Sequence, residues 1–323
     1  MKYGYYPGCS MERRSASAYQ DSTMAVTKPL GIEFEEVEDW NCCGATEYIA
    51  LNLMAAYALV ARNLALAAQQ TGTNNQLIAP CSACFLNLSK AETYLAKSPK
   101  LMEQVNIALA AGGMHHTPGN LRVRHLLDII VNDVGYAAIA EQVVKPLKGL
   151  RIAAYYGCLI VRPAFQGVFD DHEHPTSLDR LMRVLGAEVV DFPLKASCCG
   201  GHMTQISEPI AMDMLNRLLK NAADYQADMI VTLCPMCQLN LDAYQENVNK
   251  YFNTNYHIPV LYFTQMMGIA FGMPAHELGI GKEFVDARPA LAKIGMDVPE
   301  PETPKKKRPA KEELPMPRMP EGR

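Results

Sequence analysis

The segment Asn41-Cys42-Cys43-Gly44 returns later in the chain as Ser197-Cys198-Cys199-Gly200, and this repeat decides how the protein is organised. Each Cys-Cys-Gly segment is preceded by a single cysteine and followed by a Cys-x-x-Cys motif. The gaps are 32 and 37 residues in the first copy, and 39 and 34 residues in the second. The two sets use all ten cysteines of the chain: Cys9, Cys42, Cys43, Cys81 and Cys84 in the first, and Cys158, Cys198, Cys199, Cys234 and Cys237 in the second.

Corresponding cysteines lie 149 to 156 positions apart, which indicates that the chain of 323 residues is a duplicated domain. We expect an N-terminal domain over residues 1–148, a C-terminal domain over residues 149–285 and a tail over residues 286–323. The tail is rich in proline and carries charges of both signs, which is typical of a solvated, disordered segment. The other interpretation of the tail is a docking arm for a partner subunit.

The composition narrows the classes of function. A net charge of −4 offers no basic surface for nucleic acid. The N-terminus has no apolar run that would act as a secretory signal, and polar residues interrupt the two most apolar stretches, residues 49–68 and 258–273, so we expect no membrane span. The sequence therefore predicts a cytoplasmic protein, in a compartment where thiols stay reduced and bind metals or do redox work.

Predicted strands and helices alternate in both copies. Strands are expected over residues 2–6, 31–37, 76–79, 151–156, 188–192 and 229–233. Helices are expected over residues 13–28, around 51–64, from 81 onward, and over 177–185 and 212–227, with a mostly helical connector over 101–144. Every cysteine group follows a strand, directly or a few residues later. We therefore predict an α/β fold of two pseudo-symmetric domains, each with a cysteine cluster at the carboxyl ends of its strands, where such folds bind ligands.

Five soft thiolates gathered at one place suit iron–sulfur chemistry. Two adjacent cysteines can straddle a cluster if the backbone turns sharply, which Gly44 and Gly200 permit. A cubane cluster needs only four thiolates, so a fifth indicates an unusual cluster or a ligand that moves. Structural zinc, held by four of the five thiolates, is the alternative. A disulfide framework and a thioredoxin-like site fit the pattern poorly.

Two further residue types stand near the cysteines. His202 follows the second Cys-Cys-Gly segment and is either a proton donor facing a cluster or a surface histidine after a turn. Tyr5, Tyr6, Tyr155 and Tyr156 occur in the strands before Cys9 and Cys158. Strand packing explains these tyrosines best, although a phenol near a cluster can donate a hydrogen bond to sulfur.

The repeated pattern resembles that of the CCG-domain proteins, and residues 1–285 resemble the B subunit of heterodisulfide reductase. The segments that carry this resemblance are the two quoted above together with Tyr6-Pro7-Gly8-Cys9, Pro80-Cys81-Ser82-Ala83-Cys84, Tyr156-Gly157-Cys158, Cys198-Cys199-Gly200-Gly201-His202, Cys234-Pro235-Met236-Cys237 and Leu261-Tyr262-Phe263-Thr264-Gln265. Residues 41–48 are more similar to bacterial members, which include those of sulfur oxidisers.

The resemblance implies a noncubane [4Fe–4S] cluster in each half, held by all five cysteines of that half. It also implies a disulfide or thiol substrate that reacts between the two clusters. The partners that it implies are a C-like iron–sulfur subunit, which donates or accepts electrons, and an A-like flavin subunit.

We therefore interpret the chain as the catalytic iron–sulfur subunit of a heterodisulfide reductase-like complex, which cleaves or forms a disulfide in two one-electron steps. The alternatives are an electron-transfer subunit without its own catalysis and a zinc-stabilised scaffold subunit. A cavity between the two cysteine sets, wide enough for a disulfide, would favour the first interpretation.

Overall fold

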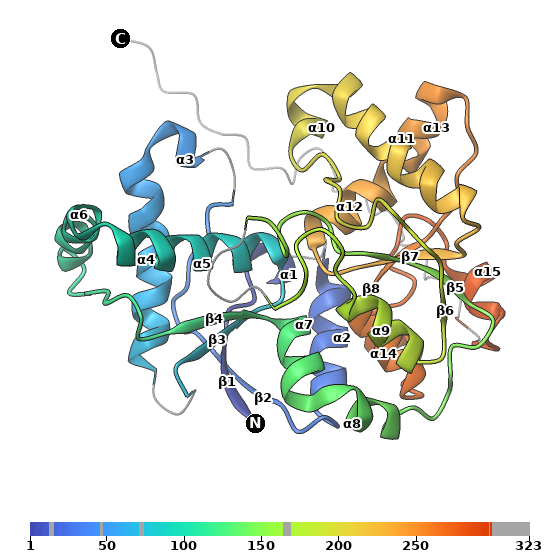
Figure 1. The fold of residues 1–323 in the computed structure, drawn as a ribbon, viewed down its shortest axis with the longest axis horizontal. Coiled ribbons are helices and arrows are strands. Elements are labelled where there is room, and N and C mark those ends of the chain that lie inside the picture. The colour runs from blue at the N-terminus through green and yellow to red at the C-terminus, as the bar shows by residue number, and fades with distance from the viewer. Residues whose placement is uncertain (13–15, 46–47, 71–73, 164–168, 297, 299–323) are drawn as a thin grey trace, which may run out of the picture.

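The protein is built from two four-stranded parallel sheets flanked by helices (Figure 1). The computed structural model describes residues 1–12, 16–45, 48–70, 74–163, 169–296 and 298. The first half contains β1 (Lys2–Tyr5), α1 (Cys9–Glu12), α2 (Ser17–Thr27), β2 (Glu33–Glu36), α3 (Tyr48–Leu51), α4 (Leu53–Gln69), β3 (Gln76–Ala79), α5 (Ser82–Lys97), α6 (Pro99–Ala110), β4 (Arg122–His125), α7 (Leu126–Asp128), the π-helical turn η2 (Ile129–Gly135) and α8 (Tyr136–Glu141).

The second half repeats much of this order. It contains β5 (Arg151–Tyr155), α9 (Ser177–Val184), β6 (Glu188–Val189), α10 (Met203–Ile206), α11 (Glu208–Asp224), β7 (Met229–Thr232), α12 (Pro235–Ala243), α13 (Gln245–Phe252), β8 (Val260–Tyr262), α14 (Phe263–Ala270), the 3₁₀-helix η3 (Ala275–Leu278) and α15 (Arg288–Ala292). The helix α9 stops just before Gly186, which adopts a φ of +93° that favours glycine.

The two sheets share one topology. Their strand orders are β2-β1-β3-β4 and β6-β5-β7-β8, so the equivalent strand occupies the equivalent place in each sheet. All pairings are parallel, which brings the carboxyl ends of the four strands to one edge of each sheet. The predicted fold of two pseudo-symmetric α/β halves is thus confirmed.

The fourth strand of each sheet departs from the expectation. All six predicted strands are present, but β4 lies within the connector that we expected to be mostly helical, and β8 precedes the helix α14. The β4 sequence, Arg-Val-Arg-His, has no apolar alternation that would predict a strand. Arg124 is nevertheless buried, because it forms an ion pair with Asp128 (2.6 Å). The strand β8 has only three residues, too few for a periodic signal.

The halves pack on each other through α2 and α14 (Figure 1). Ser22 on α2 and Thr264 on α14 share a buried hydrogen bond of 2.7 Å between their hydroxyls. Both apolar cores contain residues from each half; one joins Ile78 of β3 to Leu261 of β8, for example. The two copies therefore form one body rather than two independent globules.

The segment expected as a tail begins inside the body. In α15, Leu291 is fully buried, and Lys293 forms an ion pair with Asp228. Residues 299–323, with the basic run at 305–308, lie outside the described residues.

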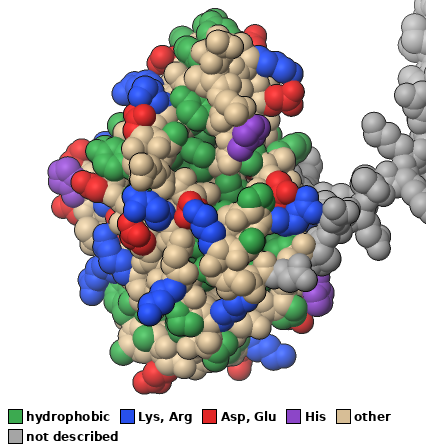
Figure 2. Space-filling view, turned by 90° about the vertical axis from the view of Figure 1, so that its right-hand side faces the viewer, with side chains coloured by type: hydrophobic (Ala, Val, Ile, Leu, Met, Phe, Trp, Pro, Cys, Tyr) green, Lys and Arg blue, Asp and Glu red, His purple; other side chains and the backbone are tan. Residues whose placement is uncertain are grey.

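The surface shows no large field of one sign on the face seen in Figure 2, where acidic and basic side chains are interspersed. Among the helices in the described part of the chain, none is long and apolar enough to cross a membrane.

Candidate functional site

The ten cysteines lie beyond the carboxyl ends of the strands, as predicted, and contact one another in a row. In the first half, the sulfurs of Cys9 and Cys42 are 3.6 Å apart, and those of Cys43 and Cys84 are 3.3 Å apart. Cys42 raises the pKa of its neighbour Cys43, and Cys43 and Cys81 raise that of Cys84, so these thiols complete the first five.

The second half repeats the same connections, from Cys158 through Cys198, Cys199 and Cys237 to Cys234.

The two sets meet in the middle, where the neighbouring thiols of Cys81 and Cys234 shift each other's pKa. These residues are the first cysteines of the two Cys-x-x-Cys motifs, and they are the N-cap residues of α5 and α12. A contact between equivalent residues is what a twofold axis produces. The complete row is therefore the same from either end: Cys9, Cys42, Cys43, Cys84, Cys81, Cys234, Cys237, Cys199, Cys198 and Cys158.

Interactions along the row shift the pKa of the thiols of the second half in two directions. The neighbouring thiols of Cys158 and Cys199 lower the pKa of Cys198. Those of Cys237 and Cys81 lower the pKa of Cys234. Neighbouring thiols and burial raise the pKa of Cys158, Cys199 and Cys237.

The arrangement can be compared with what each class of metal group needs. Within the described ranges, no three His, Cys, Asp or Glu side chains converge on one point, as a single metal ion requires. The sulfurs instead lie along the row, and the backbone approaches two of them closely. A Cβ at Gly8 would lie 2.8 Å from the Cys84 sulfur, and one at Gly157 would lie 2.9 Å from the Cys237 sulfur. This cradle fits a group that takes several thiolates at separate atoms, as an iron–sulfur cluster does.

Two buried tyrosines fix the backbone before the paired cysteines, a role that sequence reasoning missed. Tyr6 donates to the carbonyl oxygen of Asn41 (2.6 Å), and Tyr155 donates to that of Ser197 (2.8 Å). Both tyrosines stand three positions before the first cysteine of their set. This spacing, common to the two copies, was the available signal. Our interpretation of these two residues as strand packing was therefore incomplete.

A matched pair of asparagines holds the Cys-Cys segment from the other side. Asn87 donates to the carbonyl oxygen of Cys43 (3.0 Å). Asn240 donates to the carbonyl oxygens of Cys199 (3.3 Å) and Gly201 (2.8 Å), and its amide nitrogen lies 3.6 Å from the Cys199 sulfur. Each asparagine follows the last cysteine of its set by three residues, one helical turn away. Sequence reasoning missed them as well.

The other residue singled out by sequence, His202, lies at the start of α10, directly after the second Cys-Cys-Gly segment. It is half-buried. Its role as a proton donor stays a prediction.

Solvent reaches the row at its first end. An open groove of about 700 Å³ borders Cys9 and Cys42 and is lined otherwise by Glu36, Val37, Glu38, Asp39, Trp40 and Asn41. Among the described residues, the lining contains none of the second half, so this groove is not the cavity between the two sets that would favour disulfide cleavage.

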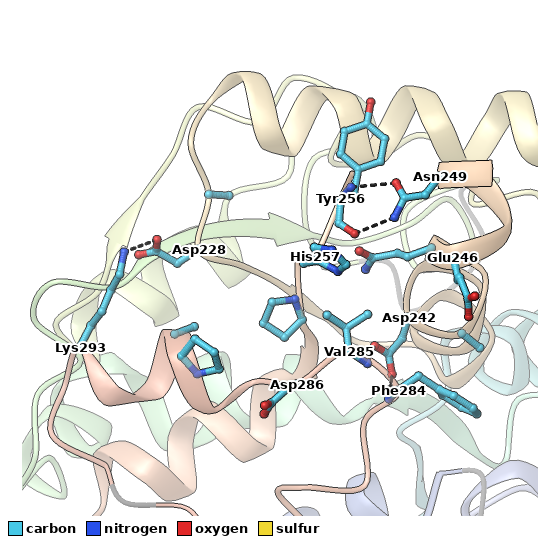
Figure 3. Close-up of a pocket in the computed structure, with 16 residues that line it drawn as sticks. Asp228, Asp242, Glu246, Asn249, Tyr256, His257, Phe284, Val285, Asp286 and Lys293 are labelled. Atoms are coloured by element: carbon cyan, nitrogen blue, oxygen red, sulfur yellow. Dashed lines mark hydrogen bonds and ion pairs between the residues drawn. The ribbon is translucent and has the colours of Figure 1, made fainter. Parts of the chain in front are cut away.

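A second cavity, of about 780 Å³, lies away from the cysteines between α12, α13 and the C-terminal segment (Figure 3). Two of its polar side chains form hydrogen bonds that hold the backbone. Asp242 accepts from the backbone N–H groups of Phe284 (2.8 Å) and Val285 (3.0 Å), and Asn249 accepts from that of Tyr256 (2.7 Å). We therefore assign the functional site to the cysteine row.

Comparison with known proteins agrees with this assignment. Residues 3–89 and residues 152–242 each match the cysteine-rich domain named CCG. The chain is 36% identical over 286 residues to the 8-methylmenaquinol:fumarate reductase membrane anchor subunit of Wolinella succinogenes, covering 88% of this chain and 98% of that protein. It is 28% identical over 301 residues to the B subunit of the ferredoxin/F(420)H(2)-dependent CoB-CoM heterodisulfide reductase of Methanosarcina acetivorans, covering 91% of this chain and 97% of that protein.

Among solved structures, a hypothetical protein from Helicobacter pylori has a similar fold, with a TM-score of 0.69 at 14% sequence identity. The match covers 88% of this chain and 52% of that one, and it concerns the fold alone. The two matched segments carry the ten cysteines, and the relatives align over most of the chain. The protein therefore belongs to the CCG cysteine-rich domain family, with two copies of the domain, and has homologues named as the B subunit of heterodisulfide reductases.

Proposed function

We propose that the protein is the iron–sulfur subunit of an oxidoreductase complex and that it acts on a disulfide or a thiol. Each set of five cysteines would hold one noncubane [4Fe–4S] cluster. The observation that carries the proposal is the palindromic row of ten thiols, because the two sets meet at Cys81 and Cys234 and two one-electron centres would lie side by side. When bound, such a cluster supplies one electron at a time and a Lewis-acidic iron for sulfur.

The residues of this chain would contribute position and protons. Tyr6 and Tyr155 hold the backbone before the paired cysteines, and the asparagines hold the backbone after them. We propose His202 as a proton donor for a leaving thiolate, since it directly follows the second Cys-Cys-Gly segment and Gly201.

We propose a cytoplasmic location, because all ten cysteines are free thiols and such thiols persist in a reducing compartment. We also propose an iron–sulfur partner subunit that exchanges electrons with the row, and a flavin subunit behind it. Homologues named as subunits of heterodisulfide reductases support a multi-subunit setting.

A second candidate function is electron transfer without catalysis on sulfur, in a complex of the fumarate reductase type. The relative at 36% identity favours it, since its name assigns it to a methylmenaquinol:fumarate reductase as the membrane anchor subunit. In this alternative the same thiol row would relay electrons between a quinol and another protein of the complex.

The first experiment is metal analysis of protein purified without oxygen. We expect about eight irons and eight sulfides per chain, four of each per half. Stoichiometric zinc with little iron would refute the proposal and support the scaffold alternative.

The second experiment separates the two candidate functions. The dithionite-reduced protein is mixed with a panel of organic disulfides or with a menaquinone analogue, and oxidation is followed by its absorbance. Oxidation by a disulfide with release of two thiols supports the disulfide function. Oxidation by the quinone alone supports the electron-transfer function.

A further inference from the structure

Tyr262 ends the strand β8 and lies at the junction of the two cysteine sets. Its Cα is in register with Thr232 on β7, and Cys234 follows Thr232 by two residues. The side chain is 2% exposed, and its hydroxyl has no hydrogen-bond partner among the residues that the structure describes. The hydroxyl of Thr232 is likewise buried and unpaired within those residues.

The ring of Tyr262 connects the two halves. It stacks on Tyr19 of α2 with a centroid distance of 4.3 Å and an interplanar angle of 3°. The hydroxyl of Tyr19 donates to the carbonyl oxygen of Pro80 (2.9 Å), the residue before Cys81. The stacked pair therefore lies between the two Cys-x-x-Cys motifs, reaching Cys81 through Pro80 and Cys234 through β7.

The equivalent residue of the first half, His125 at the end of β4, has a different setting. Its Nδ1 accepts from the backbone N–H of Leu127 (3.1 Å), and its ring packs edge-on against Phe85. The polar atom at this position is thus used by the fold in the first half and unpaired in the second.

A buried hydroxyl without a partner is costly, so it calls for an acceptor that the described residues do not supply. Burial raises the pKa of Tyr262, and the neighbouring Cys234 and Cys81 raise it further, in agreement with the position of the stacked pair between the two Cys-x-x-Cys motifs. A phenol next to thiolate or sulfide sulfur donates a hydrogen bond to it.

We propose that the hydroxyl of Tyr262 donates a hydrogen bond to sulfide sulfur of a cluster held at the Cys81–Cys234 junction and so raises the reduction potential of that cluster. The inference rests on the proposed function, since it requires a cluster. The hydroxyl would raise the potential because hydrogen bonds to cluster sulfur stabilise the more negative, reduced state.

The test is Tyr262→Phe, which keeps the ring and its stack on Tyr19 and removes only the hydroxyl. The control is Tyr3→Phe on β1 of the first sheet, where the lost hydroxyl donates to Asp133 (2.6 Å) and to the thioether sulfur of Met1 (3.6 Å), and to no cysteine. Iron and sulfide are counted first, and a redox titration followed by electron paramagnetic resonance then gives the midpoint potentials.

We expect both variants to bind as much iron as the parent protein. At a fixed solution potential, the reduced-to-oxidised ratio of one cluster should fall about tenfold in Tyr262→Phe, a shift of ~59 mV for a one-electron couple. Tyr3→Phe should not shift. An unchanged potential in fully loaded Tyr262→Phe overturns the inference, and so does a loss of iron in that variant alone, which would make the hydroxyl structural. Parent protein without iron and sulfide overturns the proposed function instead.

Discussion

Replacing Gly8 by alanine tests the cradle around the first cysteine set. Gly8 has a φ of +77°, and an added Cβ would lie 2.8 Å from the sulfur of Cys84. Gly31 has a φ of +66° with no atom within 4 Å of the added Cβ, so Gly31→Ala shares the backbone strain but not the clash.

The magnitudes follow from these two numbers. The left-handed backbone costs an alanine about 1–2 kcal/mol, and both variants should lose that much free energy of unfolding. Non-bonded atoms pack best at ~3.5–4.0 Å, so the Cys84 sulfur must move by roughly 1 Å in Gly8→Ala. Overpacking of this kind adds about 1–3 kcal/mol. We expect a loss of about 2–5 kcal/mol in Gly8→Ala.

Urea denaturation measures the loss, and iron and sulfide analysis reports on the site. Iron content should fall in Gly8→Ala and stay unchanged in Gly31→Ala, because only the first displaces a thiol. Gly157→Ala should behave like Gly8→Ala, since its Cβ would lie 2.9 Å from the Cys237 sulfur at a φ of +68°. Equal iron content in Gly8→Ala and Gly31→Ala would show that the close approach of the backbone plays no part in binding.

The remaining predictions concern the thiol row and the buried polar groups. Cys199→Ser should lose iron from one half and abolish disulfide turnover, because serine is a poor ligand for soft iron; full turnover with both clusters intact would refute the two-cluster proposal. Arg124→Ala should lower the free energy of unfolding by about 3–5 kcal/mol in urea, because it leaves the buried carboxylate of Asp128 unpaired. Burial raises the pKa of Asp133, but hydrogen bonds from Arg124 and Tyr3 outweigh burial and lower this pKa below 3.8. The contribution of the Asp133 carboxylate to the free energy of unfolding is therefore complete above about pH 4 and is lost as the pH falls further. Acid titration of stability measures this loss, and Arg124→Ala should make it smaller. Tyr156→Phe should cost about 1–3 kcal/mol, because the hydroxyl accepts from the N–H groups that begin α9 and donates to Asp179 (2.5 Å).

Sequence reasoning reached the duplicated α/β fold because the cysteine groups are local and each follows an apolar strand. It could not reach the contact between Cys81 and Cys234, since they lie in different halves and only tertiary packing brings them together. It also missed β4, because the strand has a charged sequence. Arg124 can be buried there only because it forms ion pairs with two carboxylates.

Other residues of the site do carry a signal in the sequence. Asn87 and Asn240 repeat at the same distance from the cysteines, so comparing the two copies residue by residue would have found them. Tyr262 gives no such signal, because its equivalent is a histidine and its hydroxyl matters only through what lies across the interface.

The shared cores bear on how the chain is made. Ile78 of the first half and Leu291 of the last helix belong to one apolar cluster, which cannot close until residues near 291 have left the ribosome. Through most of synthesis the first half therefore exposes the surface that α14 later covers, and Cys81 lacks its neighbour Cys234. Under the proposed function, iron can therefore reach the complete junction only after synthesis, and a nascent first half exposes apolar surface that chaperones bind.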